Sequence, residues 1–153
     1  MKKTVFVTGA NKGIGYGIAK HLGLSGWRIV LGARDENRAE KAIDELRSLG
    51  IDVAGWVAIE LVDLESIEKA AKTIATDYPE LSLLINNAGI PGDMSQASYA
   101  TDMKHIKETL DVNFIGTFAL TKALIPVIEK NKGRIANVTY LRRSALTGIR
   151  WHT

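Results

Sequence analysis

Short runs of consecutive apolar residues alternate along the chain with longer segments whose apolar residues recur every three or four positions. The runs predict buried strands and the periodic segments predict amphipathic helices. We expect strands at residues 4–7, 28–31, 53–61, 81–85 and 134–139. We expect helices at 14–25, between a cap at Asp35 and a stop at Gly50, between Asp63 and Pro79, and at 102–130.

Five strands that alternate with four helices predict an α/β fold, specifically a Rossmann-like doubly wound parallel sheet. In the first helix Ile14, Ile18 and Leu22 share one face. In the long helix an apolar stripe runs through Met103, Ile106, Leu110, Phe114 and Phe118. No internal repeat, linker or low-complexity segment divides the chain, so a single domain is expected.

The 153 residues are 46% hydrophobic and 24% charged, which is typical of a globular domain and argues against disorder or a coiled coil. The absence of cysteine excludes disulfides and thiolate chemistry. The net charge of +3 comes entirely from Arg142, Arg143 and Arg150. We therefore separate a neutral domain at residues 1–139 from a basic tail at 140–153, a weak signal for nucleic acid.

Targeting and metal signals are weak in this sequence. No uninterrupted apolar run reaches the roughly 18 residues of a membrane span, and the start of the chain is typical of a strand and not of a signal peptide. We therefore expect a cytoplasmic protein with no membrane partner. His21, His105 and His152 have no metal-ligand spacing, so no metal site is predicted.

A glycine-rich turn, Thr8-Gly9-Ala10-Asn11-Lys12-Gly13-Ile14-Gly15, joins the first strand to the first helix. Glycines allow a close backbone approach to a ligand, and a helix N-terminus offers free N–H groups to an anion. The spacing is GxxxGxG instead of the common GxGxxG, and the alternative is a tight turn that binds nothing. Its place after the first strand favours a dinucleotide phosphate.

At the end of the second strand Arg34 follows Ala33, where an NAD-binding site would carry an acidic residue. A guanidinium suits a 2′-phosphate, and Lys12 of the glycine turn approaches the same place. Together they favour NADP(H) as the cofactor; the alternative is that both are ordinary surface charges.

These segments resemble the short-chain dehydrogenase/reductase family, and the Lys12 and Arg34 pair is similar to its NADP(H)-preferring members, carbonyl reductases among them. The resemblance covers residues 1–139 and includes Asn86-Asn87-Ala88-Gly89, Asp111-Val112-Asn113 and the fifth strand. It implies that Asn113 holds a water in a catalytic proton relay and that Asn87 and Ala88 line the adenosine ribose. The cofactor-binding residues it implies are Gly9, Asn11, Lys12, Gly13, Ile14, Gly15, Arg34, Glu60, Leu61, Asn87, Ala88 and Gly89. For Asn87 and Asn113 a purely structural role is the alternative.

The sequence departs from the family's pattern at two places. Glu60 occupies the position of an adenine-contacting aspartate. Thr139 and Tyr140 replace the serine pair after the fifth strand, and no YxxxK motif follows within the chain. Tyr16 and Lys20 have that spacing, but they lie in the first helix and we regard the match as a coincidence. We expect a fold truncated after its fifth strand, inactive or severely impaired alone.

Three hypotheses follow. The first is an NADP(H)-dependent oxidoreductase acting on a small carbonyl or alcohol substrate, of which this chain holds the cofactor-binding half. The second is a catalytically silent NADP(H)-binding or partner-binding module. The third, a nucleic-acid binder, ranks lowest, and we expect no nucleic-acid partner. Because the fifth strand would be an exposed edge, a homo-oligomer is expected.

Overall fold

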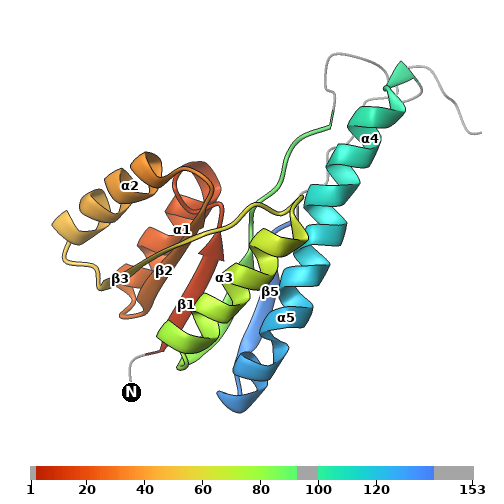
Figure 1. Ribbon diagram of the computed structural model, residues 1–153. Helices are drawn as coiled ribbons and strands as arrows, with labels where there is room; N and C mark the ends of the chain where they lie inside the picture. Colours follow the sequence, from red (N-terminus) through yellow and green to blue (C-terminus); the bar gives the residue numbers. More distant parts are fainter. Residues whose placement is uncertain (1–2, 93–99, 140–153) are drawn as a thin grey trace, which may run out of the picture.

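The apolar runs form one parallel sheet in the computed structural model, which describes residues 3–92 and 100–139 (Figure 1). Its order is β3-β2-β1-β4-β5, with every pairing parallel. This is the Rossmann-like doubly wound sheet that the sequence predicts. The strands are β1 (Thr4–Thr8), β2 (Arg28–Ala33), β3 (Val53–Ala58), β4 (Leu81–Asn86) and β5 (Arg134–Asn137).

The helices begin close to where the capping residues predict them. Asp35 accepts a hydrogen bond from the Arg38 N–H and Asp63 from the Glu65 N–H. The predicted single helix at 102–130 instead contains a π-helical segment in its middle. The elements are α1 (Gly13–Leu24), α2 (Glu36–Ser48), α3 (Leu64–Asp77), α4 (Met103–Leu110), the π-helix η2 (Asp111–Gly116) and α5 (Thr117–Lys130).

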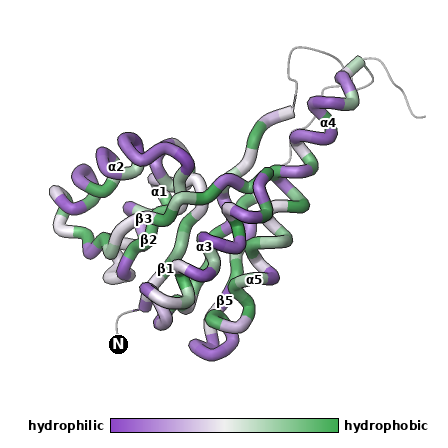
Figure 2. The backbone as a smooth tube through the Cα atoms, viewed as in Figure 1, coloured by the Kyte–Doolittle hydropathy of each residue, from purple (hydrophilic) through white to green (hydrophobic). Residues whose placement is uncertain are grey.

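Two separate hydrophobic clusters cover the two faces of the sheet (Figure 1). Alternating side chains of β1 belong to both clusters. Phe6 packs in the cluster with α3 and α5, while Val5 and Val7 pack in the cluster with α1 and α2. The strands are therefore apolar on both faces, whereas α2 is mostly hydrophilic (Figure 2). Burial on both faces explains why the strand sequences are continuous apolar runs instead of alternating ones.

The long helix presents a different face to the sheet than its most regular apolar stripe indicates. Leu120, Leu124 and Ile128 are buried, whereas Phe114 and Phe118 are 63% and 62% exposed. The predicted stripe from Met103 to Phe118 thus lies largely on the outside.

By length and composition Met103–Lys130 could span a membrane. The sequence reading missed this because charged residues interrupt the apolar positions. The buried face of α5 packs on the sheet, as in a core helix.

β5 forms one edge of the sheet among the described residues. It pairs with β4, and all four of its residues are exposed. The predicted basic tail, with Tyr140, Arg142, Arg143, Arg150 and His152, lies outside the described residues.

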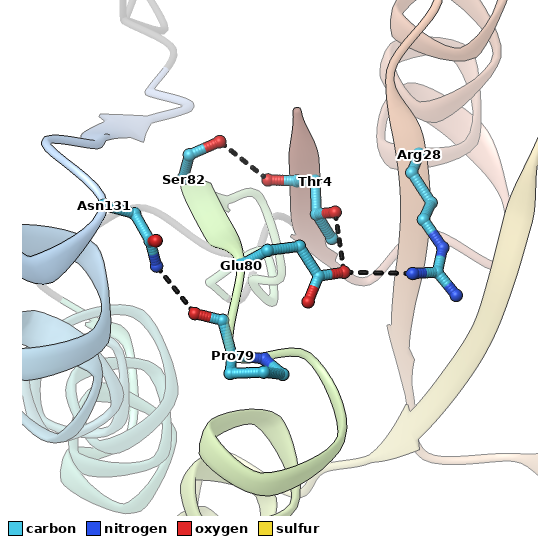
Figure 3. Close-up of polar contacts among 6 residues, drawn as sticks. All are labelled: Thr4, Arg28, Pro79, Glu80, Ser82 and Asn131. Carbon is cyan, nitrogen blue, oxygen red and sulfur yellow. Dashed lines mark hydrogen bonds and ion pairs between the residues drawn. The ribbon is translucent and has the colours of Figure 1, made fainter. Parts of the chain in front are cut away.

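A polar cluster joins three strands at the amino-terminal edge of the sheet (Figure 3). The Glu80 carboxylate accepts hydrogen bonds of 3.0 Å from both the Thr4 hydroxyl and the Arg28 guanidinium. On the other side, Ser82 donates to the Thr4 carbonyl and Asn131, after α5, donates to the Pro79 carbonyl. The cluster therefore fixes the start of β1 relative to β2 and β4.

Replacing Glu80 with Ala should lower the free energy of unfolding by about 1–2 kcal/mol, because the buried Thr4 hydroxyl loses its acceptor; the half-exposed Arg28 adds little. Urea unfolding followed by circular dichroism measures this. Glu68→Ala, on the exposed face of α3, is the control and should change stability by less than about 0.5 kcal/mol. Equal losses for both variants would contradict a structural role for the cluster.

Candidate functional site

A cavity of about 370 Å³ opens at the carboxyl ends of β1 to β4 and includes the point between β1 and β4. At this point the chain order of the sheet reverses, because the connection from β1 crosses one face and the connection to β4 crosses the other. Doubly wound sheets bind ligands at such a point. The cavity is lined by Gly9, Asn11, Lys12, Gly13, Ile14, Gly15, Gly32, Ala33, Arg34, Ile59, Glu60, Leu61, Asn87, Ala88, Gly89, Ile90 and Val112.

The N-terminus of α1 lies in the cavity wall without a side-chain cap. Lys12 at its N-cap makes no capping hydrogen bond, and the first turn holds no acidic residue. In contrast, Asp35, Asp63 and Asp102 cap the starts of α2, α3 and α4. The first N–H groups of α1 therefore remain available to an anion, where the helix dipole favours negative charge.

The glycine turn folds tightly because of two residues. Gly9 has a φ of +64°, which favours glycine, and Gly15 packs so closely that an added Cβ would collide with the Asn87 amide nitrogen and the Gly9 carbonyl oxygen. Ile14 is 69% exposed and lines the cavity. Its place in the cavity wall agrees with its prediction as a cofactor-binding residue.

Thr8 and Asn87 connect the ends of β1 and β4 directly beneath this turn. The Thr8 hydroxyl accepts hydrogen bonds of 2.9 and 3.0 Å from the N–H groups of Asn87 and Ala88. The Asn87 side-chain amide donates to the carbonyls of Thr8, at 2.9 Å, and Gly9, at 3.3 Å. Asn87 lines the cavity, but its amide N–H groups are engaged in fixing the strand ends.

Three charged side chains line the cavity: Lys12, Arg34 and Glu60. Arg34 follows β2 and Glu60 follows β3, and their charged groups lie 3.4 Å apart. The backbone beneath Glu60 is fixed, because its N–H donates to the Ser66 hydroxyl at 2.9 Å. The cavity therefore combines two cations and an uncapped helix N-terminus with a single carboxylate among its lining residues.

Asn113 lies in the π-helix and does not line the cavity itself. Its side chain bonds both backbone groups of Ile90, accepting from the N–H and donating to the carbonyl, each at 2.9 Å. This corresponds to the structural alternative for Asn113. The predicted role in holding a water remains a prediction. π-Helical turns are frequent at functional sites, and this one holds the Gly89–Ile90 segment against the cavity.

Tyr16 and Lys20 lie on α1, and neither lines the cavity. Burial raises the pKa of the Tyr16 hydroxyl, and the nearby Glu45 carboxylate raises it further. A proton-donating tyrosine that works near neutral pH needs its pKa lowered. The direction of this shift agrees with reading their YxxxK spacing as a coincidence.

All twelve residues predicted to bind the cofactor line the same cavity. Sequence reasoning missed five further lining residues, namely Gly32, Ala33, Ile59, Ile90 and Val112. The first three lie at or just after strand ends, so the rule for carboxyl ends of parallel strands could have found them. Ile90 and Val112 carry no such signal. Thr139 is exposed, and Tyr140 lies outside the described residues.

No group of three or more histidine, aspartate or glutamate side chains comes close enough to hold a metal within residues 3–92 and 100–139.

Comparison with known proteins gives a consistent picture. A family profile described as short chain dehydrogenase matches residues 3–142. The mitochondrial D-beta-hydroxybutyrate dehydrogenase of Bos taurus is 35% identical over 143 residues, which are 90% of this chain and 40% of that protein.

An actinorhodin polyketide ketoreductase solved with NADPH is 29% identical with a TM-score of 0.80, over 89% of this chain and 52% of the other. An alcohol dehydrogenase from the archaeon Thermococcus sibiricus, complexed with 5-hydroxy-NADP, is 26% identical with a TM-score of 0.82, over 90% and 57%. The chain thus spans about half the length of these relatives.

Gly15→Ala should destabilise the chain by about 1–3 kcal/mol, because its methyl group has no room beside Asn87 and Gly9. Gly17→Ala is the matched control, two residues further along α1 with open space around it. It should stabilise the helix by about 0.5–1 kcal/mol. Thermal unfolding of both variants measures this, and a Gly15→Ala variant as stable as the wild type would contradict the close packing.

Proposed function

The chain belongs to the short-chain dehydrogenase family, and from this we propose that it is the cofactor-binding part of an NADP(H)-dependent oxidoreductase that acts on a small carbonyl or alcohol substrate. The observation that carries the proposal is the cavity at the switch point, with its uncapped helix and its two cations. Its volume lies within the range of roughly 300–1,000 Å³ common for small-molecule sites. Two similar structures were solved with NADPH and with 5-hydroxy-NADP, which gives further support.

The residues of the chain divide the binding task between them. The free N–H groups of α1 and the Lys12 ammonium attract the phosphates, and the Arg34 guanidinium offers paired donors to a 2′-phosphate. Glu60 and Leu61 border the adenine side, while Asn113 holds Ile90 in place. When bound, the nicotinamide exchanges a hydride with the substrate carbon. We infer that the remaining chemistry needs groups beyond those seen in this chain.

The alternative is a catalytically silent NADP(H)-binding or partner-binding module. It is supported by the residues after β5, where Thr139 and Tyr140 take the place of the serine pair. Both candidates bind the same cofactor, so cofactor affinity does not separate them, and only measurable turnover would exclude the silent module. We further propose that the protein is cytoplasmic.

The full chain should bind NADPH more tightly than NADH, and Arg34→Asp should weaken NADPH binding by about ten- to a hundredfold, because a charged hydrogen-bond partner becomes a repulsive carboxylate. Fluorescence titration with both cofactors measures this. Lys41→Asp makes the same charge reversal on the exposed face of α2, outside the cavity, and should leave the preference intact. A preference that survives Arg34→Asp would contradict the assignment.

Turnover assays on aldehydes, ketones and quinones with NADPH complete this test. We expect no turnover by the chain alone, which agrees with both candidates. Measurable turnover would contradict the silent module and the view that the catalytic groups are incomplete.

We also propose that the chain self-associates through the outward side of its long helix. Phe114 and Phe118 lie one helical turn apart, and Leu110 and Ile115 nearby are exposed as well. A second copy of the chain would cover the same apolar residues on both partners, as two-fold interfaces do. The exposed edge of β5 adds a further surface for pairing.

Light scattering after size-exclusion chromatography should show a dimer or larger species for the wild type. Phe118→Ser should shift the equilibrium toward the monomer, because it removes apolar surface from the contact. Glu129→Ser, on the exposed side near the end of α5, is the control and should leave the mass unchanged. A monomeric wild type at all concentrations would contradict self-association.

A further inference from the structure

The cavity holds an ion pair at the place where the 2′-phosphate would bind. The Arg34 Nη1 and Glu60 Oε2 atoms lie 3.4 Å apart, and their side chains are 69% and 37% exposed. The two residues come from neighbouring strands, because β2 and β3 pair up to Ala33 and Ala58. The pairing therefore follows from the sheet register and from the length of the Glu60 side chain.

The partner of Arg34 matters because Glu60 occupies one of the two terminal nitrogens of the guanidinium, Nη1. A phosphate that binds the paired donors at this end of the side chain competes with the carboxylate for Nη1. Glu60 is also the single carboxylate among the lining residues. Its negative charge opposes the anion that α1, Lys12 and Arg34 together attract.

The strength of the pair decides whether it blocks the phosphate or only weakens its binding. Ion pairs between exposed side chains such as these are weak, because water and salt screen them. A doubly charged phosphate can displace such a partner, but it must do so each time it binds. The consequence is a reduced affinity for the phosphate and not a closed site.

We propose that Glu60 is a specificity-determining residue that weakens the preference for 2′-phosphorylated nucleotides by competing for Arg34. The proposal rests on the proposed function, because it assumes that the cavity takes the adenosine part of a dinucleotide. A ligand without the 2′-phosphate does not need the Arg34 donors, so the competition affects mainly the phosphorylated form, whereas any contact of Glu60 with adenine affects both ligands and cancels in their ratio.

Isothermal titration of the full chain with 2′,5′-ADP and 5′-AMP tests this without nicotinamide chemistry. Glu60→Gln keeps the length and the hydrogen-bonding groups and removes the charge. It should tighten 2′,5′-ADP binding about two- to fivefold and change 5′-AMP binding much less. In an Arg34→Gln background the same substitution should have a much smaller effect on the ratio, because the competition needs the guanidinium and only the direct repulsion between carboxylate and phosphate remains.

Glu40→Gln removes an equal charge from the exposed face of α2, outside the cavity, and should leave the ratio unchanged. An equal gain for Glu40→Gln would show a general charge effect and overturn the proposal, as would an unchanged ratio for Glu60→Gln or a full gain in the Arg34→Gln background. If the wild type binds neither ligand, the proposed function fails and this inference with it. If the wild type binds 2′,5′-ADP through Arg34 and Glu60→Gln changes nothing, only the role of Glu60 is lost.

Discussion

The contact between the ends of β1 and β4 is the constraint on which the cavity depends. The two strands are neighbours in the sheet, paired up to Val7 and Ile85, and hydrogen bonds between side chains and backbone extend this contact beyond the last ladder pair. The Thr8 hydroxyl extends it by accepting from two consecutive N–H groups after β4 and donating to the Ile85 carbonyl. Asn87 completes it from the other side by binding the carbonyls of Thr8 and Gly9. The floor of the cavity is therefore held in place by hydrogen bonds that engage the Thr8 hydroxyl and the Asn87 amide group.

This floor explains the arrangement of free and engaged groups above it. The Asn87 amide lies where a Cβ of Gly15 would be, so the start of α1 can approach β4 only with glycine at that position. The approach brings uncapped N–H groups into the cavity wall, whereas the other helix starts are closed by aspartates. The hydrogen-bonded strand ends are rigid, and the first N–H groups of α1 have no side-chain partner. This combination suits an anion, because the site needs little reorganisation when the anion binds.

Much of this could be predicted from the sequence because it depends on local pattern. Strand runs, capping aspartates and the glycine turn are local signals. Asn87, Glu60 and Asn113 are predicted as site residues from the family resemblance alone. The orientation of the long helix could not be predicted, since periodicity shows which residues share a face and not which face meets the sheet. Phe114 and Phe118 form the more regular stripe, yet Leu120 and Leu124 are buried. The role of Thr8 was missed because its partners lie 77 to 80 positions away.

The cavity and the open edge of the sheet belong to different parts of the architecture. The lining residues lie at or after the carboxyl ends of β1 to β4, in the first turn of α1 or in η2, and none of them belongs to β5. The sheet face beside them is buried by α1, α2, α3 and α5, so their positions are set within the described residues. Every residue that lines the cavity therefore precedes β5 in the described part of the chain, so the exposed edge and the cavity are separate features of the same sheet.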